Sequence, residues 1–382
     1  IVVENIPNWQ NLFGSQDRVP VAPGVYGTDF SRIKPGSLVR AQGGYLVLNA
    51  TDLLSEGSLW QAFKSVLRTG ELVIQPPESQ GAANAPILNP DPIPISVKVI
   101  LLGSHRLYEV LCENDSDFAK IFKIKADFDT AIDFSKKSLD SYVDVIVRIL
   151  RTEKLRDLDR SGLDQILQQS MRISGRKERL TTRFSHIADM LREADYHANR
   201  EESALIRAEH VRTAVHDMHE RLNLLEEKIQ RRIHDGDVHI ETEGETVGQL
   251  NGLTVISVGE HSFGMPARIS CRVGVGKNGV LDIESEIEMS GSSYEKGSLI
   301  LQGFITGRYA LEHPLTFTAS ICIEQSYSYI DGDSASSTGL YVLMSSLGRI
   351  PLRQDLAVTG SVDQFGRIQP IGGANEKIEG FF

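Results

Sequence analysis

The chain has 382 residues, of which 41% are hydrophobic and 24% charged, and its formal net charge is −11 at pH 7. This length predicts two or three domains, and the composition is that of a packed globular protein rather than a disordered or fibrous one. The negative charge argues against general nucleic-acid binding, because phosphate contacts need a clustered excess of Lys and Arg. We therefore expect no specific nucleic-acid partner.

Three cysteines, Cys112, Cys271 and Cys322, lie far apart in the sequence and form no C-x-x-C pair. They predict neither a disulfide framework nor a thiolate metal site, and a reducing compartment, the cytoplasm, fits best. No apolar run approaches the ~20 residues that cross a bilayer, so no membrane association is expected. The chain begins at Ile1 rather than Met, so we expect it to start partway into a longer protein.

Residues 1–132 alternate apolar strands with helices, which predicts an α/β domain. Residues 44–48 and 97–102 have the apolar runs of buried strands, and residues 59–67 have the spacing of a helix between them. Residues 75–94 are rich in proline and small residues, which predicts a loop or a projecting hairpin.

Residues 133–236 contain no proline and show helical periodicity, which predicts an all-helical domain. The last predicted helix carries one apolar stripe at steps of four and three residues, formed by Val211, Val215, Met218, Leu222, Leu225, Ile229 and Ile233. We interpret it as an amphipathic helix packed on its own domain, with an intermolecular coiled coil as the alternative. His216 and His219 lie on this helix without a further ligand at metal spacing, so no metal site is expected.

Residues 237–382 are richer in Gly, Val, Ile, Ser and Thr, which predicts a third domain, of α+β class. Helices are predicted at 297–311, at 334–347 and from residue 374. Strands are predicted at 252–258, 267–275, 280–287, 315–324, 357–362 and 366–370.

The stretch Asp-Gly-Asp-Ser-Ala-Ser at residues 331–336 stands where an apolar strand ends and a helix begins. Unpaired backbone N–H groups and the helix dipole converge at such a junction, so an oxyanion formed beside Ser334 would meet donors already in position. The alternative interpretation is an ordinary helix N-cap.

A second segment, Gly-Gly-Ala-Asn-Glu-Lys at residues 372–377, predicts a glycine turn that opens a short helix with Lys377 in its first turn. A helix N-terminus disfavours an ammonium group, so burial and the dipole together would lower the pKa of Lys377. A neutral amine there could take the proton of Ser334 and form a Ser-Lys dyad. No histidine lies within twenty residues of Ser334 in the sequence.

These segments resemble the successive motifs of the Lon protease domain, in the same order and with the same separation of 43 positions from Ser334 to Lys377. The resemblance implies that Ser334 is the nucleophile, Lys377 the base, Thr359 a hydroxyl that orients Lys377, and Asp331 a nearby polar support. It also implies a ring, commonly a hexamer, that encloses the proteolytic sites. The motifs occupy residues 324–327, 331–336, 357–362, 366–373 and 375–380.

The resemblance extends backwards to an AAA+ ATPase module, because residues 43–50 are similar to a Walker B strand. Asn49 and Ala50, however, stand where the Mg²⁺-binding Asp and the water-activating Glu are expected, so nucleotide chemistry loses its main groups. Ser104 replaces the usual polar sensor, and residues 118–125 contain no arginine finger, whereas Arg183 resembles the sensor of the helical lid. No G-x-x-x-x-G-K-[ST] motif occurs in the sequence.

The sequence therefore predicts a degenerate AAA+-like α/β domain, a helical lid and a Lon-type α+β protease domain. We expect the bacterial Lon-like group, a serine endopeptidase that cuts unfolded proteins or peptides without ATP, cofactor or metal. One alternative is an ATP-dependent Lon-like protease whose P-loop lies upstream, and another is a non-catalytic ring or holdase. The chain ends five residues after Lys377, so we also expect the protease domain to be truncated.

Overall fold

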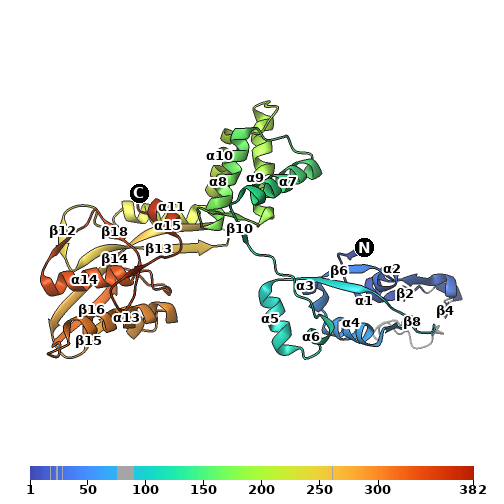
Figure 1. Cartoon of the computed structure of the whole chain (residues 1–382), viewed down its shortest axis with the longest axis horizontal. Coiled ribbons are helices and arrows are strands. Elements are labelled where there is room, and N and C mark those ends of the chain that lie inside the picture. The colour runs from blue at the N-terminus through green and yellow to red at the C-terminus, as the bar shows by residue number, and fades with distance from the viewer. Residues whose placement is uncertain (18, 23–24, 28, 75–89, 260) are drawn as a thin grey trace. The chain divides into compact units, whose positions relative to one another are not determined.

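The computed structural model describes the chain except residues 18, 23–24, 28, 75–89 and 260, and no side chain is described from 18 to 28. The chain divides into two compact units, residues 1–128 and 129–382 (Figure 1). Most of the loop or hairpin expected at 75–94 lies outside the described residues. The division into three domains at residues 132 and 236 stays a prediction.

A three-stranded parallel sheet forms the centre of the first unit, in the order β1 (Val2–Glu4), β6 (Tyr45–Asn49) and β9 (Lys98–Leu102). Both strands predicted in this region are confirmed, and they are neighbours. Leu46 and Leu48 lie two residues apart in β6, so their side chains point to the same face of the sheet. Both are fully buried in the core that also contains residues of α4 (Gly57–Thr69), the helix predicted at 59–67.

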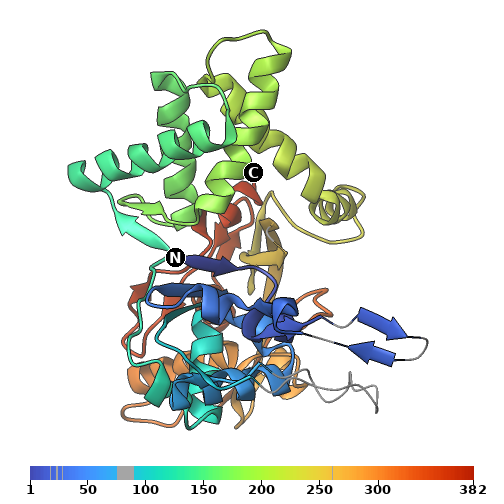
Figure 2. The same cartoon turned by 90° about the vertical axis from the view of Figure 1, so that its right-hand side faces the viewer.

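Short elements surround this sheet. β3 and β4 pair as an antiparallel ribbon that projects from the unit (Figure 2). The remaining elements are α1 (Trp9–Phe13), β2 (Gly14–Gln16), β3 (Val19–Ala22), β4 (Val25–Gly27), a 3-10 turn (Phe30–Arg32), β5 (Ile33–Pro35), α2 (Ser37–Arg40), α3 (Ala50–Leu54), β7 (Glu71–Leu72), β8 (Ile93–Pro94), α5 (His105–Asn114) and α6 (Phe118–Ile121).

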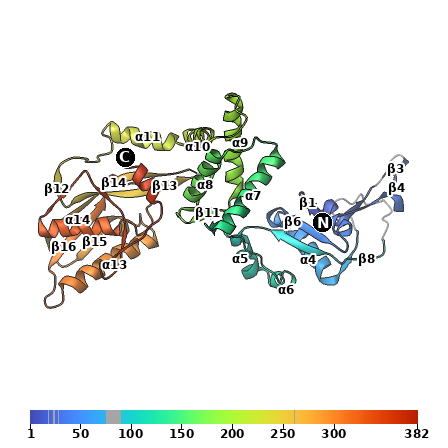
Figure 3. The same ribbon diagram turned by 45° about the horizontal axis from the view of Figure 1, so that its top comes forward.

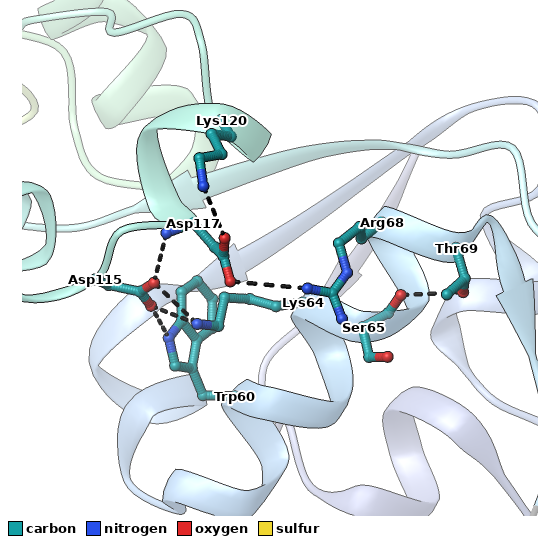
Figure 4. A network of polar contacts seen from close by, with 8 residues as sticks. All are labelled: Trp60, Lys64, Ser65, Arg68, Thr69, Asp115, Asp117 and Lys120. Carbon is teal, nitrogen blue, oxygen red and sulfur yellow. Dashed lines mark hydrogen bonds and ion pairs between the residues drawn. The ribbon is translucent and has the colours of Figure 1, made fainter.

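A buried ion pair joins α4 to the chain that follows α5 (Figure 4). Lys64 Nζ donates to Asp115 Oδ1 at 2.9 Å and Oδ2 at 2.7 Å, and Trp60 Nε1 donates to Oδ2 at 2.7 Å. The side chains of Lys64 and Asp115 are only 8% and 14% exposed. Burial raises the pKa of the Asp115 carboxyl, but hydrogen bonds from Lys64 and Trp60 outweigh burial and hold that pKa below its usual value.

The second unit begins with the predicted helical region. Its helices pack around a core that includes the fully buried Ile187 and Leu191, and the short strands β10 and β11 pair beside them. The elements are β10 (Ala131–Asp133), α7 (Lys136–Glu153), α8 (Arg160–Ser174), β11 (Arg179–Thr181), α9 (Phe184–Arg200), α10 (Ala208–Leu222) and α11 (Leu224–His234).

The prediction of a single long helix that carries the apolar stripe from 211 to 233 is wrong, because two helices, α10 and α11, cover these residues. The helix is interrupted at Asn223, whose φ of −83° and ψ of 1° depart from helical geometry. The side-chain amide of Asn223 donates to Glu220. Asn favours helix ends because its amide competes with the backbone for hydrogen bonds. Val211 is buried, whereas Leu222 and Leu225 are 50% and 41% exposed, so the stripe is only partly covered.

A five-stranded sheet of order β15-β16-β14-β13-β18 follows, and it confirms the strands predicted near 252–258, 267–275 and 315–324. Two helices, α13 (Ser292–Tyr309) and α14 (Ser336–Gly348), share one core with it, in which Leu301, Leu343, Ile269 and Ile321 are buried. The strands are β13 (Gln249–Val258), β14 (His261–Val275), β15 (Gly279–Asp282), β16 (Phe317–Ile323) and β18 (Ala357–Val358).

The strand expected at 280–287 ends early. β15 stops at Asp282, whose carboxylate accepts from the N–H of Ser285 and so caps the short helix α12 (Ile283–Glu286). The remaining elements are β12 (Glu245–Val247), β17 (Pro351–Arg353), β19 (Ser361–Val362), β20 (Ile368–Gln369) and α15 (Ala374–Glu379). Among the described helices, none is both long and apolar enough to span a bilayer.

Candidate active site

Ser334 lies in the loop that leads from β16 into α14, two residues before the helix begins. The expectation of free donors at this helix start is met only in part. The N–H of Ser336 donates to Asp333 O at 3.0 Å, and that of Ser337 donates to Gly360 O at 3.0 Å. These two groups are therefore already engaged and do not point at an incoming oxyanion.

The structure brings Ser334, Thr359 and Lys377 into direct contact. Lys377 Nζ donates to Ser334 Oγ at 2.9 Å and to Thr359 Oγ1 at 3.0 Å. Lys377 is 3% exposed although it is a lysine, whereas Ser334 is only partly buried. A buried amine thus lies within hydrogen-bond reach of the hydroxyl of a partly exposed serine, as a nucleophile and its base require.

The segment that carries Thr359 is fastened to the Ser334 loop by backbone contacts. Gly360 N donates to Ser334 O at 2.8 Å, and Thr359 Oγ1 donates to the same oxygen at 3.2 Å. Thr338 Oγ1, from the first turn of α14, donates to Val358 O at 2.8 Å. These bonds fix the Thr359 hydroxyl between the loop and the amine.

The pKa of Lys377 is lowered by burial, and the nearby carboxylate of Asp333 opposes this shift. The helix dipole has a smaller part than expected. Lys377 is the fourth of six residues in α15 and lies in its last turn rather than its first. A dipole favours cations at a helix C-terminus, so burial alone carries the shift toward a neutral amine.

Two acidic residues of the loop differ in place. Asp331 lies away from the amine, and its Oδ1 accepts from the N–H groups of Ser293 and Tyr294 at 3.1 and 3.3 Å, at the start of α13. Asp333 is the carboxylate that acts on Lys377, and its Oδ2 accepts from Ser361 Oγ at 2.6 Å. Asp333 was not among the site residues predicted from the sequence, although it directly precedes Ser334.

Strand β14 and helix α15 approach until their main chains touch. A Cβ atom at Gly264 would lie 2.0 Å from Glu376 O and 2.7 Å from Lys377 Cα, and one at Gly380 would lie 2.0 Å from Gly264 O. No side chain fits in either place without moving the backbone. The two glycines therefore let α15 lie on the sheet at the depth that places Lys377 beside Ser334.

The residues expected near a degenerate nucleotide site have structural partners of their own. Asn49 ends β6, and its side-chain oxygen accepts from Thr51 N at 2.8 Å to cap α3, while Ala50 is 4% exposed. Ser104 caps α5 through Leu107 N at 3.2 Å. Arg183 is exposed just before α9 in the second unit.

Three family models match the chain in succession. Residues 1–129 match the LonB-like AAA domain, residues 157–221 match the LID domain of the archaeal LonB AAA+ ATPase, and residues 321–380 match the Lon protease (S16) C-terminal proteolytic domain. The last match contains the Ser334, Thr359 and Lys377 cluster.

Similar whole proteins carry the same family name. A putative Lon protease homolog of Escherichia coli (strain K12) is 33% identical over 353 residues, covering 92% of this chain and 59% of that protein. One of Haemophilus influenzae is 33% identical over 360 residues, covering 92% and 58%. The archaeal Lon protease of Thermococcus kodakarensis is 25% identical over 396 residues, covering 96% and 57%.

The chain thus spans less than two thirds of the length of each of these relatives. Its mixed α/β fold contains an AAA-like domain, a lid domain and a Lon protease domain in the order of the three models. With these matches and the serine and lysine brought together in the third domain, the chain belongs to the Lon protease family.

Proposed function

We propose that the protein is a serine endopeptidase in which Ser334 is the nucleophile and Lys377 its general base. The observation that carries the proposal is the 2.9 Å contact between Lys377 Nζ and Ser334 Oγ, made by an amine that is almost fully buried. Burial lowers the pKa of that amine, which increases the neutral fraction at working pH.

The reaction is acyl transfer. Neutral Lys377 takes the proton of Ser334 as Oγ attacks the peptide carbonyl, and the resulting ammonium returns a proton to the leaving amine. Lys377 then deprotonates a water that hydrolyses the Ser334 ester and restores the hydroxyl. Thr359 holds the amine through its 3.0 Å contact, while Asp333 stabilises the ammonium form.

We propose unfolded proteins or peptides as substrates, a ring of identical chains, with a hexamer as the expected size, and independence from ATP. Asn49 and Ala50 support the last point, because an amide and a methyl group supply no carboxylate for Mg²⁺ or for activation of water. The three separate free cysteines agree with a reducing compartment, and we propose the cytoplasm.

The test compares Ser334→Ala with Ser337→Ala in hydrolysis of unfolded casein. Ser337 is a matched control because, among the described residues, its buried hydroxyl has no hydrogen-bond partner. Ser334→Ala should lower the rate by about 10³-fold or more, whereas Ser337→Ala should stay within roughly twofold of the parent. Circular dichroism checks that both variants fold, and a Ser334→Ala variant that cleaves near the parent rate would refute the proposal.

A further inference from the structure

Two histidines and a glutamate from three elements meet on the second unit, outside the Ser334 site. His219 comes from the end of α10, Glu226 from the start of α11 and His261 from the first position of β14. One ligand atom from each residue lies within 4.8 Å of the other two. Figures 1 and 3 show α11 running beside the C-terminal end of the chain and near β14.

The three side chains are already close to the separation that one ion imposes. His261 Nε2 and Glu226 Oε2 are 2.9 Å apart, and the rings of His219 and His261 are 5.0 Å apart between centroids. A tetrahedral zinc ion, with ligands at about 2.0–2.1 Å, separates its ligand atoms by roughly 3.3 Å. The ligand atoms, which all lie within 4.8 Å of one another, are therefore within about 1.5 Å of the separation that a tetrahedral ion requires.

The chemistry of the cluster is that of a zinc-type ligand set. Two imidazoles and one carboxylate suit zinc and similar divalent ions rather than calcium or magnesium, which prefer oxygen ligands alone. A neutral imidazole has the free lone pair that a metal needs.

One side of the cluster is buried and the other is open. The side chain of His261 is 4% exposed and that of Glu226 is 29% exposed. His219 and Glu226 line an open cavity of about 740 Å³ between α8, α10, α11 and α15. An ion can enter from this cavity, and a water held there can complete four-coordination.

A second group of possible ligands is formed by Glu201, Glu209 and His210, but its histidine has no lone pair available for an ion. His210 Nδ1 accepts from Arg207 N at 3.0 Å, which places the ring proton on Nε2. That nitrogen then donates to Glu201 Oε2 at 3.0 Å and has no lone pair for an ion. The first group differs because, among the described residues, no hydrogen bond to Nδ1 of His261 fixes the ring proton on Nε2, so Nε2 can offer its lone pair to an ion.

We propose that His219, Glu226 and His261 bind one zinc-type divalent cation, which fastens α10 and α11 to strand β14. The site lies beside the helix that carries Lys377. Gly264, three residues after His261, touches α15, and Arg172 of α8 binds Glu379 of α15 with nitrogen to oxygen distances of 2.8 and 2.5 Å. The ion therefore stabilises the junction from which α15 is held.

The test titrates metal-stripped protein with Co²⁺, read by its visible absorption, and then displaces Co²⁺ with Zn²⁺. The intact chain should bind one equivalent of Co²⁺, and the visible spectrum of the complex should be that of tetrahedral Co²⁺. His219→Ala and Glu226→Gln should weaken binding by about 100-fold or more, since even the loss of an outer-shell partner costs 10–100-fold. His216→Ala is the matched control, because His216 is an exposed histidine of the same helix and cavity but lies outside the cluster.

Thermal unfolding gives a second measurement that does not depend on absorption. Zn²⁺ should raise the Tm of the parent and of His216→Ala, and should leave that of His219→Ala and Glu226→Gln unchanged, because only a binding native state is stabilised. Glu226 is partly exposed and His219 is exposed, so the variants are expected to fold. No stoichiometric binding by the parent, or equal binding by all variants, would show that the three residues form only a hydrogen-bonded cluster.

Discussion

The end of strand β6 and the loop before α14 are two places where a strand leads into a helix. They differ in whether the reactive side chains expected there are present. At β6 the parallel strands and the cap of α3 are present, but Asn49 and Ala50 carry no carboxylate. Before α14, Ser334 retains its hydroxyl and meets a buried amine at 2.9 Å. The region at the end of β6 thus has the strands and the helix cap without the reactive side chains. The loop before α14 has both the backbone arrangement and the reactive side chains.

The difference shows that a fold and its chemistry depend on separate residues. The sheet of the first unit is stabilised by packing of residues such as Leu46 and Leu48, and neither needs the groups that bind Mg²⁺. The proposed active site instead depends on three polar side chains, Ser334, Thr359 and Lys377, whose loss would leave the hydrophobic core untouched. Substitutions can therefore test each region without unfolding the other.

The largest effect is expected from Lys377→Arg. A guanidinium stays protonated and cannot accept the Ser334 proton, so the rate of peptide hydrolysis should fall by about 10³-fold or more. In the parent, the acylation rate should rise with pH through an apparent pKa below the usual lysine value, because burial favours the neutral amine. The measurement is the pH profile of acylation by a small activated peptide.

A Lys377→Arg enzyme with the parent rate and pH profile would exclude Lys377 as the base. A matched variant, Lys34→Arg, changes an exposed lysine of the first unit that pairs with Asp17. It should leave the protease rate unchanged, so a loss in both variants would indicate a general effect of the substitution on the protein.

A smaller effect is expected from Thr359→Val, which keeps the shape but removes the hydroxyl that contacts Lys377 at 3.0 Å and Ser334 O at 3.2 Å. The rate should fall by roughly 10–100-fold, and the apparent pKa of the profile should change. Thr359→Ser is the control, since it restores the hydroxyl and should recover most of the rate. A rate loss that Ser fails to rescue would indicate a packing role instead.

A stability effect confined to the first unit is expected from Asp115→Ala. It leaves the buried Lys64 without its partner, which should cost about 3 kcal/mol of the free energy of unfolding of that unit. The double variant Lys64→Met with Asp115→Leu should recover much of this loss. Urea unfolding measures both, and unchanged protease activity below the transition would support the independence of the two regions.

The pH dependence of the same ion pair has a definite sign. The pKa of Asp115 is lower in the folded state, so its contribution is fully present above the unfolded value, near 3.8, and is lost as pH falls toward the folded pKa. Asp115→Asn should therefore remove part of the acid sensitivity of the first unit. Parallel acid-unfolding curves for the parent and this variant would contradict the assignment.

The smallest effect is expected from nucleotide. Because Asn49 and Ala50 offer no carboxylate, added Mg-ATP should change casein turnover by less than roughly twofold, and no ATP hydrolysis should be detected. Ala50→Gly serves as a control for the buried position. Stimulation of several-fold would instead favour the alternative of an ATP-dependent Lon-like protease.

Much of this architecture could be predicted from the sequence, because apolar periodicity reports burial. The strands β6, β9, β13, β14 and β16 and the helices α4, α13 and α14 all lie where hydrophobic runs predicted them. The contact between Ser334 and Lys377 followed from two motifs and their spacing. Local patterns therefore identified the elements, while the pairing of Ser334 with Lys377 came from the resemblance of the two motifs to the Lon protease domain.

The remaining features depend on three-dimensional placement that no local pattern records. Asp331 and Asp333 belong to one short motif, and only the turn of the loop decides which of them faces Lys377. His261 is far from His219 in the sequence, so the cluster forms only once β14 lies beside the helices. The break at Asn223 depends on a single polar residue within an otherwise regular stripe.

Because Gly264 contacts the backbone of α15, the proposed active site requires a residue without a side chain at position 264. A chain could retain the serine and the lysine and still be inactive if position 264 gained a methyl group, because Cβ would meet the helix backbone at 2.0 Å and lift Lys377 away. Activity inferred for distant homologues from the reactive pair alone would then be overcounted. The absence of a side chain at 264 is as much a part of the site's signature as its hydroxyl and its amine.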